Sequence, residues 1–168
     1  MLKLEFKSTN YHSESKIEFY DSITRIPFTI RMGNHFEFPE SIYCDNIYDK
    51  TFVDFRFVKS DNSLFEINLI GTNNEHVIEK EDVLAITDEQ YFICRLVESE
   101  SILRDTVPVK FLRRTRSLQL LFNQSDQLSF GYFKITPNIY LSTSEEGFLT
   151  SIVLDGLSKD DIYNILGF

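Results

Sequence analysis

The segment TFVDFRFVKSDNSLFEINL, residues 51–69, carries the strongest structural signal in the sequence. Apolar side chains occupy every second position on both sides of a polar SDNS segment: Val53, Phe55 and Phe57 before it, and Phe65, Ile67 and Leu69 after it. A period of two is typical of strands with one buried face, and a polar tetrapeptide between two such runs is typical of a turn. Residues 51–69 are therefore predicted to form a β-hairpin, whose solvent-facing side brings Asp54 within reach of Arg56.

The same alternation recurs along most of the chain. It is clear at residues 2–6 and 26–32, and further strands are predicted at 16–20, 91–97, 107–111, 118–122, 128–135, 139–142 and 148–154. The polar segment 8–15 is predicted to be a loop or an arm, whereas 77–86 and 98–105 fit either a short helix or a strand. The 16 Phe and 8 Tyr agree with this pattern, because aromatic residues favour strands.

Only the last ten residues have a helical pattern. Ser158 is a suitable N-cap, and Asp161 three residues later takes the place of the capping-box acid. The apolar positions that follow share one helical face: Ile162, Ile165 and Leu166. The sequence therefore predicts one domain, residues 1–168, that is mainly β (all-β or α+β), with antiparallel sheets in a sandwich or half-barrel and a short C-terminal helix.

Length and charge exclude several classes of protein. The chain has 168 residues, 26 acidic and 17 basic side chains and a net charge of −9, and folding at this size buries roughly 70% of the unfolded surface. Nucleic acids and anionic membranes attract basic proteins, so neither is an expected partner. The sequence shows no signal peptide or membrane-spanning run and only two cysteines, Cys44 and Cys94, so a reducing, cytoplasmic location is expected.

Motifs that carry chemistry are absent from the sequence. The three histidines are isolated from one another and from both cysteines, and no nucleophile elbow or glycine-rich phosphate loop occurs. We therefore expect no metal, no cofactor and no catalytic residues. An alternative is an enzyme whose site is assembled from scattered residues, for which His35, Cys44 and Asp45 are candidates.

Basic residues are concentrated in one segment. Five of the 17 fall between positions 104 and 116 beside a single acid: Arg104, Lys110, Arg113, Arg114 and Arg116. The rest of the chain carries 25 acidic and 12 basic side chains. Guanidinium groups bind phosphate and carboxylate in a bidentate manner, so Arg113, Arg114 and Arg116 are candidates for binding an anion or an acidic patch. The alternative is that the cluster neutralises neighbouring acidic strands at a sheet edge.

Acidic residues are accompanied by aromatic or apolar residues in two stretches. The candidate partner-binding residues in them are Tyr43, Asp45, Tyr48 and Asp49, and Glu75, Glu79, Glu81, Asp82, Asp88 and Glu89. Tyrosines supply contact area at low entropic cost, and carboxylates attract a basic partner over long distances. The alternative is that the tyrosines are core residues and the acids keep the surface soluble.

These features favour a small acidic inhibitor that binds another protein. The expected example is a bacterial immunity protein that neutralises a basic, possibly nuclease, toxin domain by direct binding, with an acidic face for the partner and a separate positive edge. Besides the enzyme, the alternatives are a structural subunit of a phage or secretion machine and a phage protein that blocks a defence enzyme.

Overall fold

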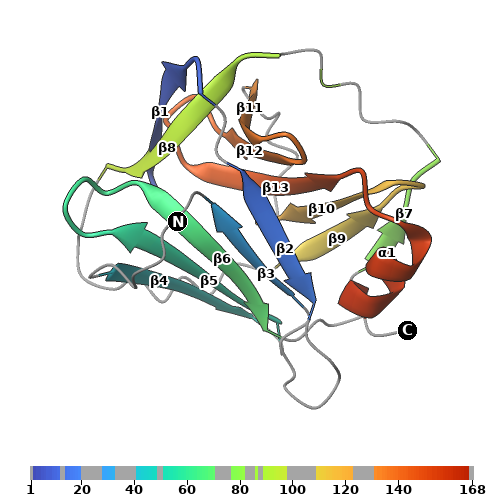
Figure 1. Ribbon diagram of the computed structural model, residues 1–168. Coiled ribbons are helices and arrows are strands. Elements are labelled where there is room, and N and C mark those ends of the chain that lie inside the picture. Colours follow the sequence, from blue (N-terminus) through green and yellow to red (C-terminus); the bar gives the residue numbers. More distant parts are fainter. Residues whose placement is uncertain are drawn as a thin grey trace.

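Two β-sheets and one short helix make up the described part of the chain (Figure 1). The computed structural model describes residues 2–11, 14–19, 28–32, 41–48, 51–70, 77–81, 86, 89–97, 109–122 and 131–166, with backbone alone at 19, 41–48 and 70. This mainly β architecture with a C-terminal helix confirms the predicted fold class. Within these ranges no helix has the length and apolar character needed to cross a membrane.

The larger sheet has eight strands, in the order β1-β8-β11-β12-β13-β10-β9-β7. Their bounds are β1 (Leu4–Thr9), β7 (Val77–Glu79), β8 (Tyr91–Leu96), β9 (Lys110–Arg113), β10 (Ser117–Leu121), β11 (Gly131–Thr136), β12 (Ile139–Thr143) and β13 (Leu149–Asp155). Two neighbouring pairs, β8 with β11 and β7 with β9, are parallel. The sheet is therefore mixed, whereas the sequence predicted antiparallel pairing, because parallel pairs join strands that are distant in the chain.

The smaller sheet has five antiparallel strands in the order β2-β3-β6-β5-β4. They are β2 (Ser15–Phe19), β3 (Phe28–Met32), β4 (Ser41–Tyr48), β5 (Thr51–Val58) and β6 (Leu64–Ile70). Pairing of β5 with β6 confirms the predicted hairpin. At its turn, the Asn62 amide donates to the Val58 carbonyl at 2.8 Å, and Asn62 has a positive φ of 57°, which Asn tolerates better than most residues.

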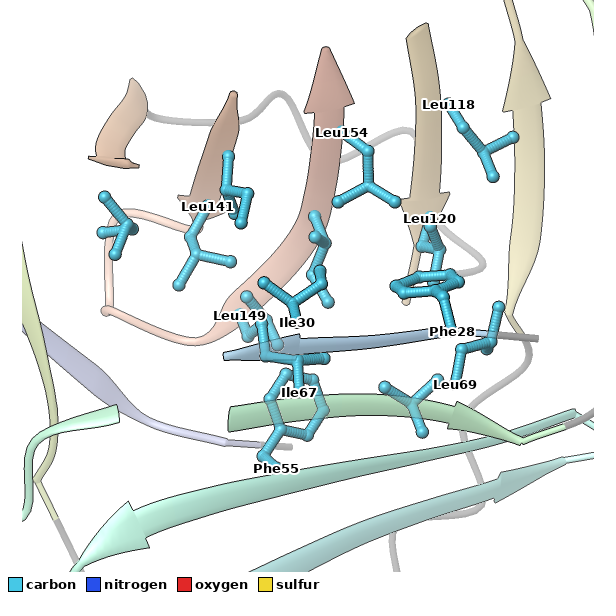
Figure 2. Packing of buried hydrophobic residues seen from close by; sticks show 14 of the residues in the cluster. Phe28, Ile30, Phe55, Ile67, Leu69, Leu118, Leu120, Leu141, Leu149 and Leu154 are labelled. Atoms are coloured by element: carbon cyan, nitrogen blue, oxygen red, sulfur yellow. The ribbon is translucent and has the colours of Figure 1, made fainter. Parts of the chain in front are cut away.

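The hydrophobic core lies between the two sheets, as Figure 2 shows. Ten labelled residues, each at most 3% exposed, meet there: Phe28, Ile30, Phe55, Ile67 and Leu69 from the five-stranded sheet, and Leu118, Leu120, Leu141, Leu149 and Leu154 from the eight-stranded sheet. Facing sheets whose inner side chains form one core are a sandwich. Of the two predicted arrangements, the sandwich is the one observed.

Helix α1 (Lys159–Leu166) begins as predicted. The Asp161 amide donates to Ser158 Oγ at 3.1 Å, and the Ser158 amide donates to Asp161 Oδ2 at 2.9 Å, which is a reciprocal capping box. The predicted apolar face is buried: Ile162, Ile165 and Leu166 are at most 2% exposed. The helix is thereby fixed against the sandwich.

Local details differ from the sequence-based expectations. Strand β4 was not predicted. The predicted loop at 8–15 is shorter than expected, because β1 extends to Thr9 through pairing with β8 and β2 begins at Ser15. The strand predicted at 107–111 runs over 110–113 instead. In the ambiguous stretch 77–86, β7 is a strand of three residues, while 98–105 lies outside the described residues.

Candidate functional site

Strand β7 ends the eight-stranded sheet and carries part of the predicted acidic stretch. It runs parallel to β9 with Glu79 in register with Arg113, and the Lys80 amide donates to the Arg113 carbonyl at 2.9 Å. Arg113 belongs to the predicted basic cluster. The expectation of an acidic face and a separate positive edge is therefore wrong at this point, because parallel pairing places the two stretches side by side.

Arg113 contacts groups from two other elements. Its Nη1 donates to Glu79 Oε1 at 2.9 Å, and its Nη2 donates to the Tyr163 hydroxyl of α1 at 3.3 Å. The guanidinium carbon of Arg113 and the Nζ of Lys159 lie 4.8 Å and 5.5 Å from the centre of the Tyr163 ring. The hydrogen bond from Arg113, followed by the positive charge of Lys159, lowers the pKa of the Tyr163 hydroxyl below its ordinary value.

Arg114 is anchored by a polar network within the eight-stranded sheet. It is 8% exposed, and its Nη1 donates to Gln119 Oε1 at 3.1 Å. Gln119 Nε2 in turn donates to Ser151 Oγ at 3.0 Å and to the Tyr132 hydroxyl at 3.2 Å, and Ser151 Oγ lies 2.7 Å from Ser142 Oγ. Because a hydrogen-bonded network of buried groups is rigid, it fixes the position of the Arg114 guanidinium.

A cleft of about 410 Å³ lies beside β7, the β9–β10 hairpin and the start of α1. It is lined by Glu79, Lys80, Glu81, Arg113, Arg114, Thr115, Lys159 and Ile162. Four of these side chains are cationic and two are anionic, so the lining has a formal charge of +2 in a chain of −9. We take this cleft, with the adjoining edge strand β7, as the candidate functional site.

The predicted site residues are divided between this cleft and other places. Glu79, Glu81, Arg113 and Arg114 line the cleft, whereas Arg116 is exposed in the turn between β9 and β10. Of the other acids, Glu89 is exposed next to the start of β8. Four predicted residues lie outside the described part of the chain: Asp49, Glu75, Asp82 and Asp88.

The other predicted acidic stretch lies on β4, at the edge of the five-stranded sheet. Its residues Tyr43, Asp45 and Tyr48 are the register partners of Arg56, Asp54 and Thr51 on β5. The two acidic stretches therefore belong to different sheets.

Sequence reasoning did not assign four of the lining residues to a site: Lys80, Thr115, Lys159 and Ile162. It also missed Tyr163, which contacts Arg113. The predicted N-cap at Ser158 places Lys159 in the first helical turn, but its approach to Arg113 depends on tertiary packing.

Comparison with models of known protein families gives no match, and comparison with curated proteins gives none either. The features that bear on function are therefore the cleft, the edge strand and the distribution of charge.

A second polar cluster lies on the five-stranded sheet, on the side away from the core. Glu66 is 2% exposed and accepts hydrogen bonds from Arg31 Nε at 2.9 Å and from Asn68 Nδ2 at 2.9 Å, and it pairs with Arg56 Nη1 at 2.8 Å. Asp54 Oδ2 accepts from Arg56 Nε and from Asn68 Nδ2, each at 2.9 Å. The predicted pairing of Asp54 with Arg56 is thus confirmed.

The prediction that this side of the hairpin faces water is wrong for its centre, since Asp54 and Asn68 are only 5% and 6% exposed. The charges of Asp54 and Glu66 are balanced by those of Arg31 and Arg56, and buried charges need such partners. We assign this cluster a role in stability.

The residues considered for an enzyme receive little support. His35 lies outside the described residues, and of Cys44 and Asp45 only the β4 backbone is described. Cys94 is free and 2% exposed, and burial raises the pKa of its thiol, which suppresses the nucleophilic thiolate. Where side chains are described, no group of three or more His, Cys, Asp or Glu is placed to hold a metal ion.

Proposed function

We propose that the protein is a protein-binding inhibitor, of the kind that bacteria use as immunity proteins, and that it binds a basic partner through the edge at β7. The observation that carries this proposal is Ile78, which is 42% exposed on β7. The neighbouring Glu79 side chain is 75% exposed, and Glu81 is exposed as well. An exposed large apolar side chain surrounded by charged groups resembles the centre and rim of a protein interface.

The position of β7 in the sheet supports the same proposal. In the described part of the chain, β7 pairs with β9 on one side and has no strand on the other. The outer backbone N–H and C=O groups of such an edge strand are able to pair with an added strand from a partner. Main-chain pairing would supply affinity, and contacts of Ile78 would supply specificity.

Charge supports a basic partner. The net charge of −9 attracts a positively charged protein over long distances and accelerates association, most strongly at low ionic strength. A toxin domain that binds a phosphate backbone has such a basic surface, because its substrate requires one.

The test is to isolate the partner from cells of the source and to measure its binding to variants. Glu81→Lys changes one exposed acid of the predicted partner-binding set, directly after β7. Glu145→Lys changes one exposed acid between β12 and β13, so the net charge changes equally. We expect association with the first variant to be about threefold slower than with the second, and Ile78→Ser to accelerate dissociation. Glu79 is left unchanged because of its bond to Arg113.

Three results would contradict the proposal. If only metabolites or further copies of this chain are recovered, the inhibitor function is wrong. If both charge-reversed variants slow association equally, only net charge matters and β7 is not the contact. If Ile78→Ser leaves dissociation unchanged, the exposed isoleucine is not in the interface.

A further inference from the structure

We propose that the cleft beside β7, the β9–β10 hairpin and α1 binds the phosphate group of a small phosphate monoester. Its four cations come from three separate segments: Lys80 after β7, Arg113 and Arg114 at the end of β9, and Lys159 at the start of α1. A phosphate group has three terminal oxygens, and cations that approach from several directions can satisfy them together. This proposal does not depend on the proposed partner binding.

The charge of the cleft agrees with a phosphate dianion. Glu79 offsets Arg113, to which it is bonded at 2.9 Å, and Glu81 offsets one further cation. The remaining formal charge of +2 matches the charge of about −2 on a phosphate monoester near neutral pH. A single carboxylate would balance only half of it.

The two arginines are held in position before any ligand arrives. Arg114 is fixed by Gln119 at 3.1 Å, and Arg113 is fixed by the Tyr163 hydroxyl at 3.3 Å. The two lysines are exposed on flexible stems, so they are able to close on a bound anion. A rigid pair of guanidiniums with adjustable ammonium groups reduces the entropic cost of binding.

The size of the cleft favours an ester over free phosphate. Its volume of about 410 Å³ falls within the usual range for small-molecule sites, which is about 300–1,000 Å³. Thr115 is exposed and supplies a hydroxyl group beside the cations, whereas Ile162 is almost completely buried behind the lining. Thr115 would contact the organic part of the ester.

Isothermal titration calorimetry at low salt tests the proposal with three probes: inorganic phosphate, adenosine monophosphate and adenosine. We expect the monophosphate to bind more tightly than inorganic phosphate, and adenosine not to bind. Binding of inorganic phosphate as tightly as the monophosphate would overturn the assignment of an ester. Binding of adenosine as tightly as the monophosphate, or no binding of either phosphate, would overturn the phosphate site.

Charge variants then locate the site, all at exposed positions. Lys80→Gln and Lys159→Gln should each weaken monophosphate binding about fivefold, because each removes one charged donor. Glu81→Gln should tighten binding about threefold, because it removes a repelling charge. The matched control is Lys7→Gln, on β1 at the opposite edge of the same sheet, which should leave binding unchanged.

The lysine variants are expected to weaken monophosphate binding and Glu81→Gln to tighten it. These opposite effects distinguish the proposal from a loss of folding, which would weaken binding in every variant. Equal weakening by Lys7→Gln and Lys80→Gln, or weakening by Glu81→Gln, would overturn the assignment of the cleft. Failure of the proposed inhibitor to bind a protein partner would not change any of these results.

Discussion

Replacing Glu66 by Gln tests whether the polar cluster on the five-stranded sheet stabilises the fold. Glu66 is 2% exposed and lies 2.9 Å from Arg31 Nε and 2.8 Å from Arg56 Nη1. Gln has the same size, but it lacks the charge and brings an NH2 donor toward the guanidiniums. Both arginines would lose their common counter-ion.

The magnitude follows from burial. Removing one partner of a fully buried ion pair costs ~3–5 kcal/mol of unfolding free energy. Here the side chains of Arg31 and Arg56 are 45% and 28% exposed, so they regain part of their hydration when Glu66 is neutralised. We therefore expect Glu66→Gln to lower the free energy of unfolding by ~2–3 kcal/mol.

Urea denaturation followed by circular dichroism measures this loss, with the m-value checked for constancy. The matched control is Glu18→Gln, which also faces Arg31, at 3.2 Å, but is 22% exposed and pairs with the largely exposed Lys16. We expect the control to lose ~0.5 kcal/mol, as is usual for surface pairs. If Glu66→Gln loses no more than Glu18→Gln, burial of the carboxylate does not determine its contribution, and the reasoning is refuted.

Three further predictions concern the core, the helix and the cleft. Phe55→Ala should lower the unfolding free energy by ~3–5 kcal/mol, and a loss below ~1 kcal/mol in the same urea assay would contradict its place between the sheets. Ser158→Ala should cost ~1 kcal/mol through loss of the N-cap, and thermal unfolding that is unchanged would contradict the capping box. Ultraviolet absorbance follows the ionisation of tyrosines, and subtracting the titration of Tyr163→Phe from that of the wild type isolates Tyr163. We expect its hydroxyl to ionise below its ordinary pKa, and Arg113→Gln to raise that pKa. Because the pKa of Tyr163 is lowered in the folded state, ionisation of its hydroxyl stabilises the fold fully above a pH of about 10, and this stabilisation is lost as the pH falls through the folded-state pKa. If Arg113→Gln leaves the titration of Tyr163 unchanged, the hydrogen bond between them is contradicted.

Elements that depend on local sequence were predictable. The β5–β6 hairpin follows from a period of two on both sides of a polar turn, and α1 follows from the capping pattern around Ser158. In both cases the pairing or capping partners are close in the chain. Local preference and tertiary packing therefore favour the same structure.

Elements that depend on distant partners were not predictable. Strand β4 contains Asp45 and Asn46, which have low strand propensity, and it forms because all eight of its residues pair with β5. Strand β7 is short and depends on β9, 34 residues away, so the meeting of Glu79 with Arg113 was not visible. The candidate cleft combines three segments in the same way, and only half of its lining residues were identified from the sequence.

The order of strands along the chain has a consequence for folding during synthesis. All five strands of the smaller sheet, β2 to β6, follow one another in the sequence. They come after β1 and before β8, which is the neighbour of β1 in the larger sheet. The smaller sheet is thus able to pair while later residues are still being translated, but β1 has to wait for β8 and pays the entropy of closing a long loop. Until β10, β12 and β13 emerge from the ribosome, the apolar face of the smaller sheet lacks the strands that cover it, so aggregation of the nascent chain is favoured at this stage.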